Sequence, residues 1–181
     1  MGNKILIHSC CAPCAAPSVE RVQLDGYDVA LYFSNSNIYP EAEYHQRLEN
    51  MRKLSDIYEV ILEEDLYDHD AWLEHIRGFE DEPEKGLRCQ KCFEFNLERT
   101  AQLAKLHGYS HFTTTLTLSP HKISKIIFAI GAKFPEYKAY DFKKKHGFLR
   151  SIALSKEWDL YRQSYCGCEF SMRTRSQDVP K

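Results

Sequence analysis

Residues 4–23 read KILIHSCCAPCAAPSVERVQ, and this stretch decides the fold. It opens with a short apolar run typical of a buried strand, and residues 15–23 have the pattern of a helix. Cys10, Cys11 and Cys14 lie between the two. The stretch therefore predicts a strand, a loop and a helix, with a group of thiols just beyond the carboxyl end of the strand.

Strands and helices continue to alternate along the chain. Apolar and β-branched runs predict strands at residues 28–35, 58–62 and 111–116. Helical spacing predicts helices at residues 41–58, 71–78, 92–106 and 121–132, with Cys89 and Cys92 opening the third of these. We predict an α/β fold, a parallel sheet with helices on both faces, in which ligands bind beyond the carboxyl ends of the strands.

Length and composition indicate a soluble globular protein with an ordinary core. The chain has 181 residues, of which 43% are hydrophobic and 28% charged. We expect a single domain over residues 1–181, with an α/β core at 1–132 and a basic helical segment holding the last cysteines at 133–181. No apolar stretch approaches the roughly 18 residues of a membrane span, and the N-terminal run is too short for a signal peptide. A cytoplasmic location, where thiols stay reduced, is therefore expected.

The seven cysteines fall into three tight clusters rather than scattering along the chain. These clusters are Cys10-Cys11-x-x-Cys14, Cys89-x-x-Cys92 and Cys166-Gly167-Cys168. Thiols one to three residues apart can bind the same inorganic centre, or each other. In a reducing compartment such clusters indicate metal binding or redox chemistry more often than structural disulfides.

Several kinds of thiol site fit these clusters. Structural zinc would use Cys11 and Cys14 with the C-x-x-C pair at residues 89–92. A four-cysteine iron–sulfur cluster suits the larger number of thiols, and the helix after Cys92 points its positive end at an anionic cluster. A thioredoxin-like C-x-P-C motif at residues 11–14 leaves the other cysteines unexplained. The pair at residues 166–168 would form a strained, easily reduced disulfide, or else provide further metal ligands.

The net charge of −2 conceals a strong asymmetry along the chain. Residues 1–121 carry 11 Lys and Arg against 20 Asp and Glu, whereas residues 122–181 carry 13 against 6. A basic C-terminal third indicates a polyanionic partner, although a solvated helix face has the same composition. Aromatic residues interleave with the basic ones from residue 137 to residue 165, a mixture that suits an unstacked RNA loop as well as core packing.

Motifs spread over nearly the whole chain are similar to those of one family. They are His8-Ser9-Cys10-Cys11-Ala12-Pro13-Cys14, Cys89-x-x-Cys92, Thr114-Thr115-Leu116, Ser119-Pro120-His121-Lys122, Asp141-Phe142-Lys143-Lys144, Arg150-Ser151, Ser155-Lys156-Glu157 and Tyr161-Arg162-Gln163-x-Tyr165-Cys166-Gly167-Cys168. With these residues the chain resembles the QueH-type epoxyqueuosine reductase family.

The resemblance implies a reaction and a fold. The reaction is the reduction of epoxyqueuosine to queuosine at the wobble position of certain tRNA anticodons, a two-electron deoxygenation in queuosine biosynthesis. The fold is a sheet like that of adenine-nucleotide α-hydrolases and PP-loop tRNA-modifying enzymes. No S-G-G-x-D-S loop follows the first strand, so use of ATP is not expected, and Cys10-Cys11 take its place.

The resemblance also implies roles for individual residues. We expect Cys10, Cys11, Cys89 and Cys92 to hold a [4Fe-4S] cluster. Cys166 and Cys168 would act as a redox-active dithiol, or with Cys14 would ligate a second metal, a mononuclear iron. Asp141 is a candidate proton donor or ligand, or else a cap to the basic run, and His8 is expected to be structural. The residues expected to contact tRNA phosphates are Lys143, Lys144, Lys145, Arg150 and Arg162.

The sequence leaves two other functions open. A PP-loop-like tRNA thiolase could hold an iron–sulfur cluster, and a zinc RNA-binding module would have no catalytic activity. Formation of queuosine without added ATP separates the reductase from both. The expected electron donor is of the ferredoxin or flavodoxin class.

Overall fold

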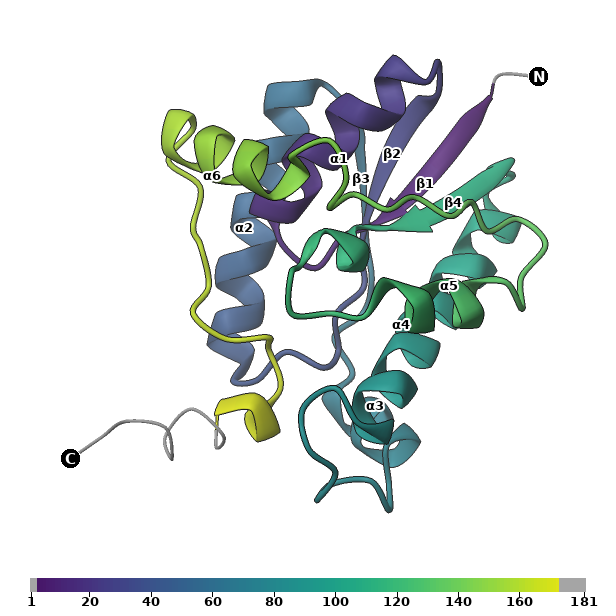
Figure 1. The fold of residues 1–181 in the computed structure, drawn as a ribbon, viewed down its shortest axis with the longest axis vertical. Coiled ribbons are helices and arrows are strands. Elements are labelled where there is room, and N and C mark those ends of the chain that lie inside the picture. The colour runs from purple at the N-terminus through teal and green to yellow at the C-terminus, as the bar shows by residue number, and fades with distance from the viewer. Residues whose placement is uncertain (1–2, 173–181) are drawn as a thin grey trace.

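A four-stranded, wholly parallel sheet forms the centre of the computed structural model, which describes residues 3–172 (Figure 1). Its strands are β1 (Lys4–His8), β2 (Asp28–Phe33), β3 (Ile61–Glu64) and β4 (His111–Thr114), in the order β3-β2-β1-β4. In this register Ile7 lies opposite Leu31 on one side and Thr113 on the other. The prediction of a parallel α/β fold is confirmed.

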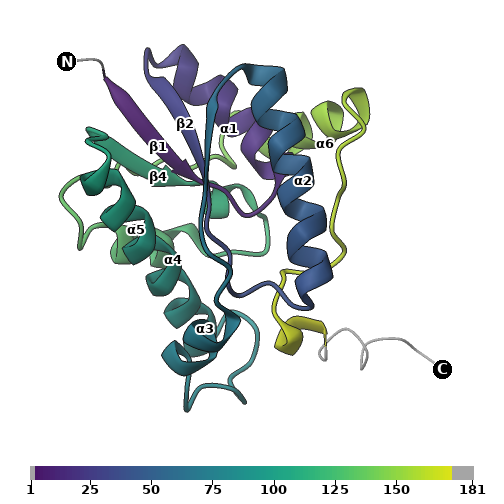
Figure 2. The ribbon, with the colours of Figure 1, turned by 180° about the vertical axis from the view of Figure 1, so that it is seen from behind.

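Helices cover both faces of the sheet (Figures 1 and 2). They are α1 (Ala12–Leu24), α2 (Glu41–Tyr58), α3 (His69–His75), α4 (Leu87–Leu106), the 3₁₀ helix η1 (Thr115–Leu118), α5 (Ser124–Gly131) and α6 (Gly147–Glu157). Ile5 and Ile7 pack against α1, α2 and α6, whereas Leu6 packs against α4 and α5. This alternation follows from the two-residue period of a strand.

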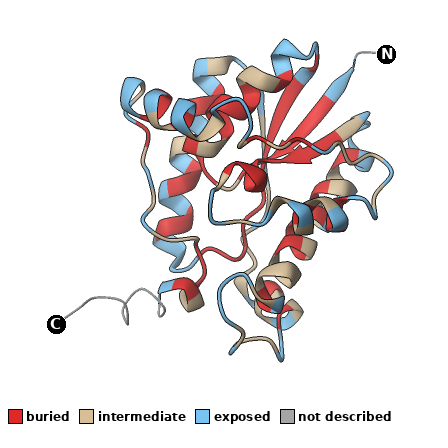
Figure 3. Ribbon diagram, in the orientation of Figure 1, coloured by how far each residue is buried: buried red, intermediate tan, exposed pale blue. Residues whose placement is uncertain are grey.

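The central strand is buried on both faces. Ile5, Leu6, Ile7 and His8 of β1 are all fully inaccessible to solvent, and Figure 3 shows the sheet as the buried centre of the protein. A parallel strand covered on both faces has a continuous apolar run rather than an alternating one, and residues 5–7 show that pattern.

Most element boundaries differ from those predicted by a few residues, and three of the differences, at β3, β4 and α5, have a clear local cause or consequence. Helix α2 continues to Tyr58 and ends at Glu59 in the left-handed conformation, so β3 begins at Ile61 rather than at residue 58. Strand β4 ends at Thr114, whose hydroxyl accepts the N–H of Leu116 and starts η1. Helix α5 begins at residue 124 rather than 121, which leaves residues 119–123 as a loop.

The C-terminal part of the described chain packs into the main core. Tyr140, Phe142, Leu154 and Leu160 are buried in the same apolar cluster as residues of β1 and α1. Residues 133–172 therefore add a layer to the α/β unit, with α6 lying over α1 (Figure 1). Residues 173–181, the end of the predicted basic segment, lie outside the described residues. Within residues 3–172, no helix is both long and apolar enough to span a membrane.

Candidate metal and redox site

The candidate site lies where the strand order reverses direction. From β1 the chain passes to β2 on one side, whereas β4 pairs with the other side of β1. The loops after β1 and β4 meet at the carboxyl edge, the usual ligand position in open α/β sheets. There the Cys10 N–H donates to the Thr115 hydroxyl at 3.4 Å, and the Cys10 sulfur lies 3.7 Å from the same oxygen.

His8 at the end of β1 links the ends of β2 and β4 through hydrogen bonds. Its Nε2 lies 3.0 Å from the Ser34 carbonyl oxygen, and its Nδ1 lies 2.9 Å from the Thr114 hydroxyl. Because a carbonyl only accepts, Nε2 carries the proton and Nδ1 accepts from Thr114. Burial lowers the pKa of His8 and favours this neutral form. Both ring nitrogens are occupied, so His8 is structural, as expected.

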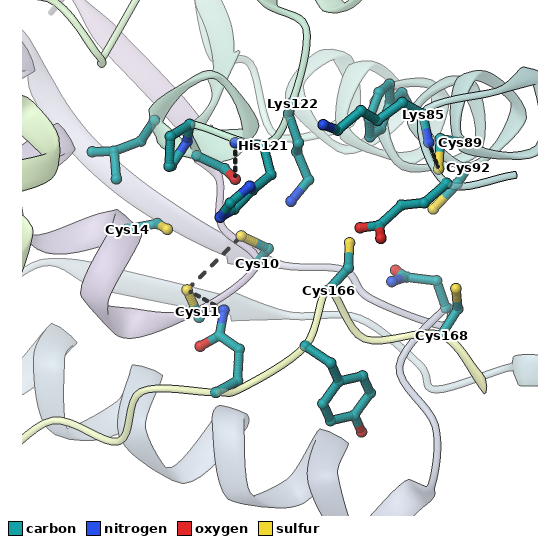
Figure 4. Close-up of a pocket in the computed structure, with 18 of the residues that line it drawn as sticks. Cys10, Cys11, Cys14, Lys85, Cys89, Cys92, His121, Lys122, Cys166 and Cys168 are labelled. Carbon is teal, nitrogen blue, oxygen red and sulfur yellow. Dashed lines mark hydrogen bonds between the residues drawn. The ribbon is translucent and has the colours of Figure 1, made fainter. Parts of the chain in front are cut away.

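All seven cysteines line one pocket (Figure 4). They come from the β1–α1 loop and the start of α1, from the first turns of α4, and from the segment after α6. No disulfide joins any two of them. Three segments that are far apart in the sequence therefore bring reduced thiols to one cavity.

Cys10, Cys11 and Cys14 form the tightest group, here called the thiol triad. Their sulfur atoms all lie within 4.8 Å of one another, and those of Cys10 and Cys11 are 3.9 Å apart. In residues 3–172 this is the only group of three or more His, Cys, Asp or Glu side chains close enough to share one ion. The triad lies at the N-terminus of α1, where the helix dipole favours negative charge.

Cys11 is the thiol of the triad that loses its proton most easily. Hydrogen bonds from Cys10 and Cys14 hold the pKa of the Cys11 thiol well below its usual range, and the Arg47 charge and the Gln163 amide act in the same direction. The Gln163 Nε2 lies 3.2 Å from the Cys11 sulfur. The hydrogen bond to Cys11 raises the pKa of Cys10, and hydrogen bonds to Cys10 and Cys11 raise the pKa of Cys14. Cys11 is therefore the first of the three to carry negative charge.

The other four cysteines lie across the pocket from the triad. Cys89 and Cys92 are on α4, one turn apart, and the Lys85 N–H donates to the Cys89 sulfur at 3.3 Å. Burial raises the pKa of Cys92 well above its usual range, and the charges of Cys166 and Cys168 raise it further. In Figure 4 the Cys166 side chain extends into the space between the triad and α4. Cys166 thus lies between the two groups, whereas Cys168 packs in the same apolar cluster as Cys92.

Arg47 of α2 holds the C-x-C segment in place, a role that sequence reasoning missed. Its guanidinium is only 1% exposed and donates to the carbonyl oxygens of Cys166 at 3.0 Å and Tyr165 at 3.3 Å. Glu43 accepts from its Nε at 2.7 Å and balances its charge. Arg47 therefore anchors the backbone beside Cys166 while its charge stabilises the Cys11 thiolate.

Gly167 should be sensitive to substitution. Its φ of 149° is rare for residues with side chains, and an added Cβ would lie 3.3 Å from atoms of Asn37 and Ile38. We expect Gly167→Ala to lower stability by about 1 kcal/mol or more, and to slow turnover by moving the two thiols. Thermal unfolding and product formation measure the two effects.

Gly78→Ala is the matched control. Gly78 also has a positive φ, 86°, but nothing lies within 4 Å of its added Cβ. It should lose stability and keep full turnover per folded molecule. Equal turnover in the two folded variants would contradict a special requirement for glycine between the thiols.

Lys122 is a second residue that the sequence did not single out as functional. It lies in the loop at residues 119–123, created by the late start of α5, and it lines the thiol pocket (Figure 4). Burial disfavours its charge, but the negative charges of Cys166, Cys10, Cys14 and Cys11 outweigh that effect and raise the pKa of Lys122. The charged form of Lys122 is therefore favoured beside the thiols. Only its place in the Ser-Pro-His-Lys motif could have drawn attention to it.

The structure places Asp141 away from the thiols. Its carboxyl lines a second pocket, beside Lys144 and Lys145, and its Oδ1 is buried with no hydrogen-bond partner among the described residues. It does not line the thiol pocket. No contact therefore supports a catalytic role for Asp141, which stays a prediction.

The five residues expected to bind tRNA have different surroundings. Lys144 and Lys145 are exposed, and no hydrogen bond or ion pair ties either ammonium to another described residue. Arg150 pairs with both carboxylate oxygens of Glu20, at 2.7 and 3.0 Å. The ammonium of Lys143 instead donates into the protein, to the carbonyl oxygen of Lys122 at 2.5 Å and the hydroxyl of Ser124 at 3.0 Å.

The fifth, Arg162, lines the thiol pocket and donates to the Ser155 hydroxyl at 3.0 Å. Of the five, Lys144 and Lys145 are thus the freest to contact phosphates, and Arg162 is the nearest to the thiols.

Fold and site together define a class of protein, an α/β protein whose thiol-lined cavity suits metal binding and redox chemistry. The profile of one family, the epoxyqueuosine reductase QueH family, matches residues 5–174. The chain is 37% identical over 187 residues to epoxyqueuosine reductase QueH of Streptococcus pyogenes serotype M1, covering 97% of this chain and 72% of that protein.

Two further relatives are matched over nearly their full length. Epoxyqueuosine reductase QueH of Thermotoga maritima is 34% identical over 181 residues, 96% of this chain and 92% of that protein. Epoxyqueuosine reductase QueH of Dehalococcoides mccartyi is 36% identical over 181 residues, 94% of this chain and 93% of that protein. The chain belongs to the epoxyqueuosine reductase QueH family and is an oxidoreductase. Family membership favours this activity over a tRNA thiolase or a zinc RNA-binding module.

Proposed function

We propose that this chain reduces epoxyqueuosine to queuosine at the wobble position of tRNA, and that the reaction takes place in the thiol pocket. The observation that carries this proposal is the convergence of seven reduced thiols from three distant segments on one cavity at the carboxyl edge of the sheet. Removal of an epoxide oxygen requires two electrons, two protons and a group that takes up charge on oxygen. Thiols supply electrons and protons, and bound metal supplies Lewis acidity.

The thiols also fit an iron–sulfur cofactor. Soft thiolate ligands select iron–sulfur clusters, zinc or copper(I), and the triad sulfurs are close enough to contact one centre. As the family resemblance implies, Cys10, Cys11, Cys89 and Cys92 hold a [4Fe-4S] cluster. Cys14, beside two of these ligands, is free for a second centre, a mononuclear iron. When bound, such a cofactor supplies electrons one at a time and an electrophilic metal.

Cys166 and Cys168 act as the dithiol of the reaction. Oxidation of two thiols to a disulfide releases two electrons and two protons, the amounts that convert an epoxide into an alkene and water. Gly167 between them has a φ of 149°, a conformation that glycine adopts far more readily than other residues. An external donor of the ferredoxin or flavodoxin class then restores the dithiol.

Apolar side chains form part of the pocket wall. Phe93, Trp72 and Phe148 line it together with the cysteines. A bound substrate that covers these walls displaces water, which strengthens the electrostatic interactions inside.

The tRNA lies over α6 and the run before it. Phe148 and Ser151 of α6 line the thiol pocket, and Lys144 and Lys145 lie just before the same helix. The base to be reduced enters the pocket while neighbouring phosphates reach the two lysines and Arg162. This placement accords with the excess of basic residues after residue 121.

Changing Lys144 and Lys145 together to serine should weaken tRNA binding. Each lost phosphate contact removes about 0.7 from the log–log slope of affinity against salt for a single strand. We expect a slope flatter by about 1.4, a raised KM and unchanged iron content. Filter binding at several salt concentrations measures the slope.

The control changes Lys4 and Lys105, both exposed, to serine. Lys4 begins β1 and Lys105 ends α4, so both lie at the opposite edge of the sheet. This variant has the same net charge, and its salt slope should equal that of the unchanged protein. Equal losses in the two variants would indicate only a general effect of net charge.

Three further proposals complete the assignment. The sheet is of the adenine-nucleotide α-hydrolase or PP-loop type, with Cys10-Cys11 where that class binds phosphates, a view supported by the parallel order and the switch-point position. Residues 1–181 form one domain, supported by the shared core of residues 5–160. A tRNA substrate implies that the protein acts in the cytoplasm.

The function is tested with anaerobic protein, tRNA bearing epoxyqueuosine, a low-potential reductant and no ATP. Mass spectrometry of the digested tRNA should show loss of one oxygen atom from the modified base. A thiolase would require ATP and add sulfur. A zinc RNA-binding module would leave the base unchanged, and either result would refute the proposal.

A further inference from the structure

Four lysine and arginine side chains line the thiol pocket: Lys85, Arg88, Lys122 and Arg162. Arg88 donates to the carbonyl oxygens of Glu80 and Glu82, and Arg162 donates to the Ser155 hydroxyl. Lys85 is exposed to solvent, whereas Lys122 is half-buried. No hydrogen bond or ion pair within residues 3–172 occupies the Lys122 ammonium. Figure 4 shows this side chain extending toward the space between Cys10 and Cys166.

Hydrogen bonds from Lys143 fix the loop that carries Lys122. The Lys143 ammonium donates to the Lys122 carbonyl oxygen and to the hydroxyl of Ser124, the first residue of α5. Burial lowers the pKa of Lys143, and its nitrogen is directed inward rather than toward a surface ligand. Lys143 thus fixes the backbone from which the Lys122 side chain extends into the pocket.

We propose that the Lys122 ammonium binds the epoxide oxygen of the substrate and stabilises the negative charge that develops there as the first C–O bond breaks. This inference rests on the proposed function and adds a catalytic residue to it. Such a role requires a cation that extends into the pocket and is not neutralised by a carboxylate. Lys122 lines the pocket and extends between Cys10 and Cys166, and no carboxylate of residues 3–172 forms an ion pair with it.

The electrons and protons that the epoxide reduction consumes can all come from side chains of this pocket. Two C–O bonds break, one C=C bond forms, and the oxygen leaves with two protons as water. The two electrons and two protons come from the thiols of Cys166 and Cys168, which become a disulfide. The Lys122 ammonium is neither consumed nor oxidised, because it donates a hydrogen bond to the oxygen until the protons arrive.

The test uses the anaerobic holoenzyme and Lys122→Met, which keeps the length of the side chain and removes its charge. We expect kcat to fall about 10²- to 10³-fold, the usual effect of removing one such donor. Lys122→Arg should recover part of the loss. Lys125→Met, at an exposed lysine that is the second residue of α5, is the matched control and should change neither kcat nor KM.

Binding without reductant provides a readout independent of turnover. The unchanged protein should bind tRNA bearing epoxyqueuosine at least about tenfold more tightly than tRNA bearing queuosine, because queuosine lacks the epoxide oxygen that accepts the hydrogen bond from the charged donor. Lys122→Met should bind the two tRNAs equally. Lys143→Met, which frees the loop but leaves the ammonium, should retain part of the preference.

Other outcomes overturn the inference. Retained discrimination and rate in Lys122→Met would show that the ammonium does not contact the oxygen. Loss of iron and of visible absorption in that variant would assign its charge to cofactor retention instead. Failure of the unchanged holoenzyme to form queuosine would refute the proposed function itself, a result that is distinguishable from both.

Discussion

Cys11→Ala is expected to remove the metal centre and to reduce queuosine formation at least about 10³-fold, because a cluster that four cysteines would hold is not retained when one of these ligands is lost. Cys11 is the thiolate of the triad, stabilised by Cys10, Cys14 and the charge of Arg47. Its sulfur is also the one that Gln163 contacts. Anaerobically reconstituted protein should carry about four iron and four sulfide per chain, and the variant should carry neither.

Cys14→Ala and Cys89→Ala distinguish two possible sets of cluster ligands. The family resemblance assigns the cluster to Cys10, Cys11, Cys89 and Cys92, whereas the geometry places Cys14 beside the first two. With the assigned ligands, Cys89→Ala should lose the four-iron spectrum and Cys14→Ala should keep it. The reverse result would make the thiol triad the ligand set and Cys89 a thiol of the opposite wall. Stoichiometric zinc without sulfide in iron-replete preparations would refute the cluster altogether.

The sequence was sufficient to predict the centre of the fold for a physical reason. Residues 5–7 are a strand buried on both faces, which leaves an apolar run that no surface element shows. Cysteine spacing likewise indicated a shared thiol site, and all seven cysteines do line one pocket. Boundaries were less predictable: α5 starts later than its pattern indicates, since residues 119–123 form the loop that brings Lys122 to the thiols.

The supporting cations could not be predicted, because their roles depend on distances between remote segments. Arg47 reads as an ordinary residue of an amphipathic helix, yet it is fully buried and donates to carbonyl oxygens 118 and 119 positions away. Lys143 reads as part of a basic run and instead turns inward to Lys122. From composition alone, both would be assigned to the surface. Only the tertiary fold shows that these cations bind other segments of the protein rather than phosphate groups of a ligand.

Cys166→Ser is expected to abolish turnover, again by at least about 10³-fold, while leaving the four-iron spectrum unchanged. Its thiol lies in the pocket beside Lys122, and its carbonyl is fixed by Arg47, so the sulfur is positioned without any need for a metal. Cys168 is only 9% exposed, whereas Cys166 is half-buried. Of these two thiols, Cys166 should therefore react first with a small alkylating agent, since solvent access is one of the factors that govern thiol reactivity.

The two thiols should also be lost together during the reaction. A single turnover without external reductant should leave two fewer alkylatable cysteines per chain in the unchanged protein, and none fewer in Cys166→Ser or Cys168→Ser. Ser164→Ala, in the same pocket-lining segment, is the control and should behave as the unchanged protein. Loss of iron from either serine variant would make Cys166 and Cys168 metal ligands. In that case electrons would have to reach the substrate without a dithiol, and the balance proposed for the epoxide reduction would no longer hold.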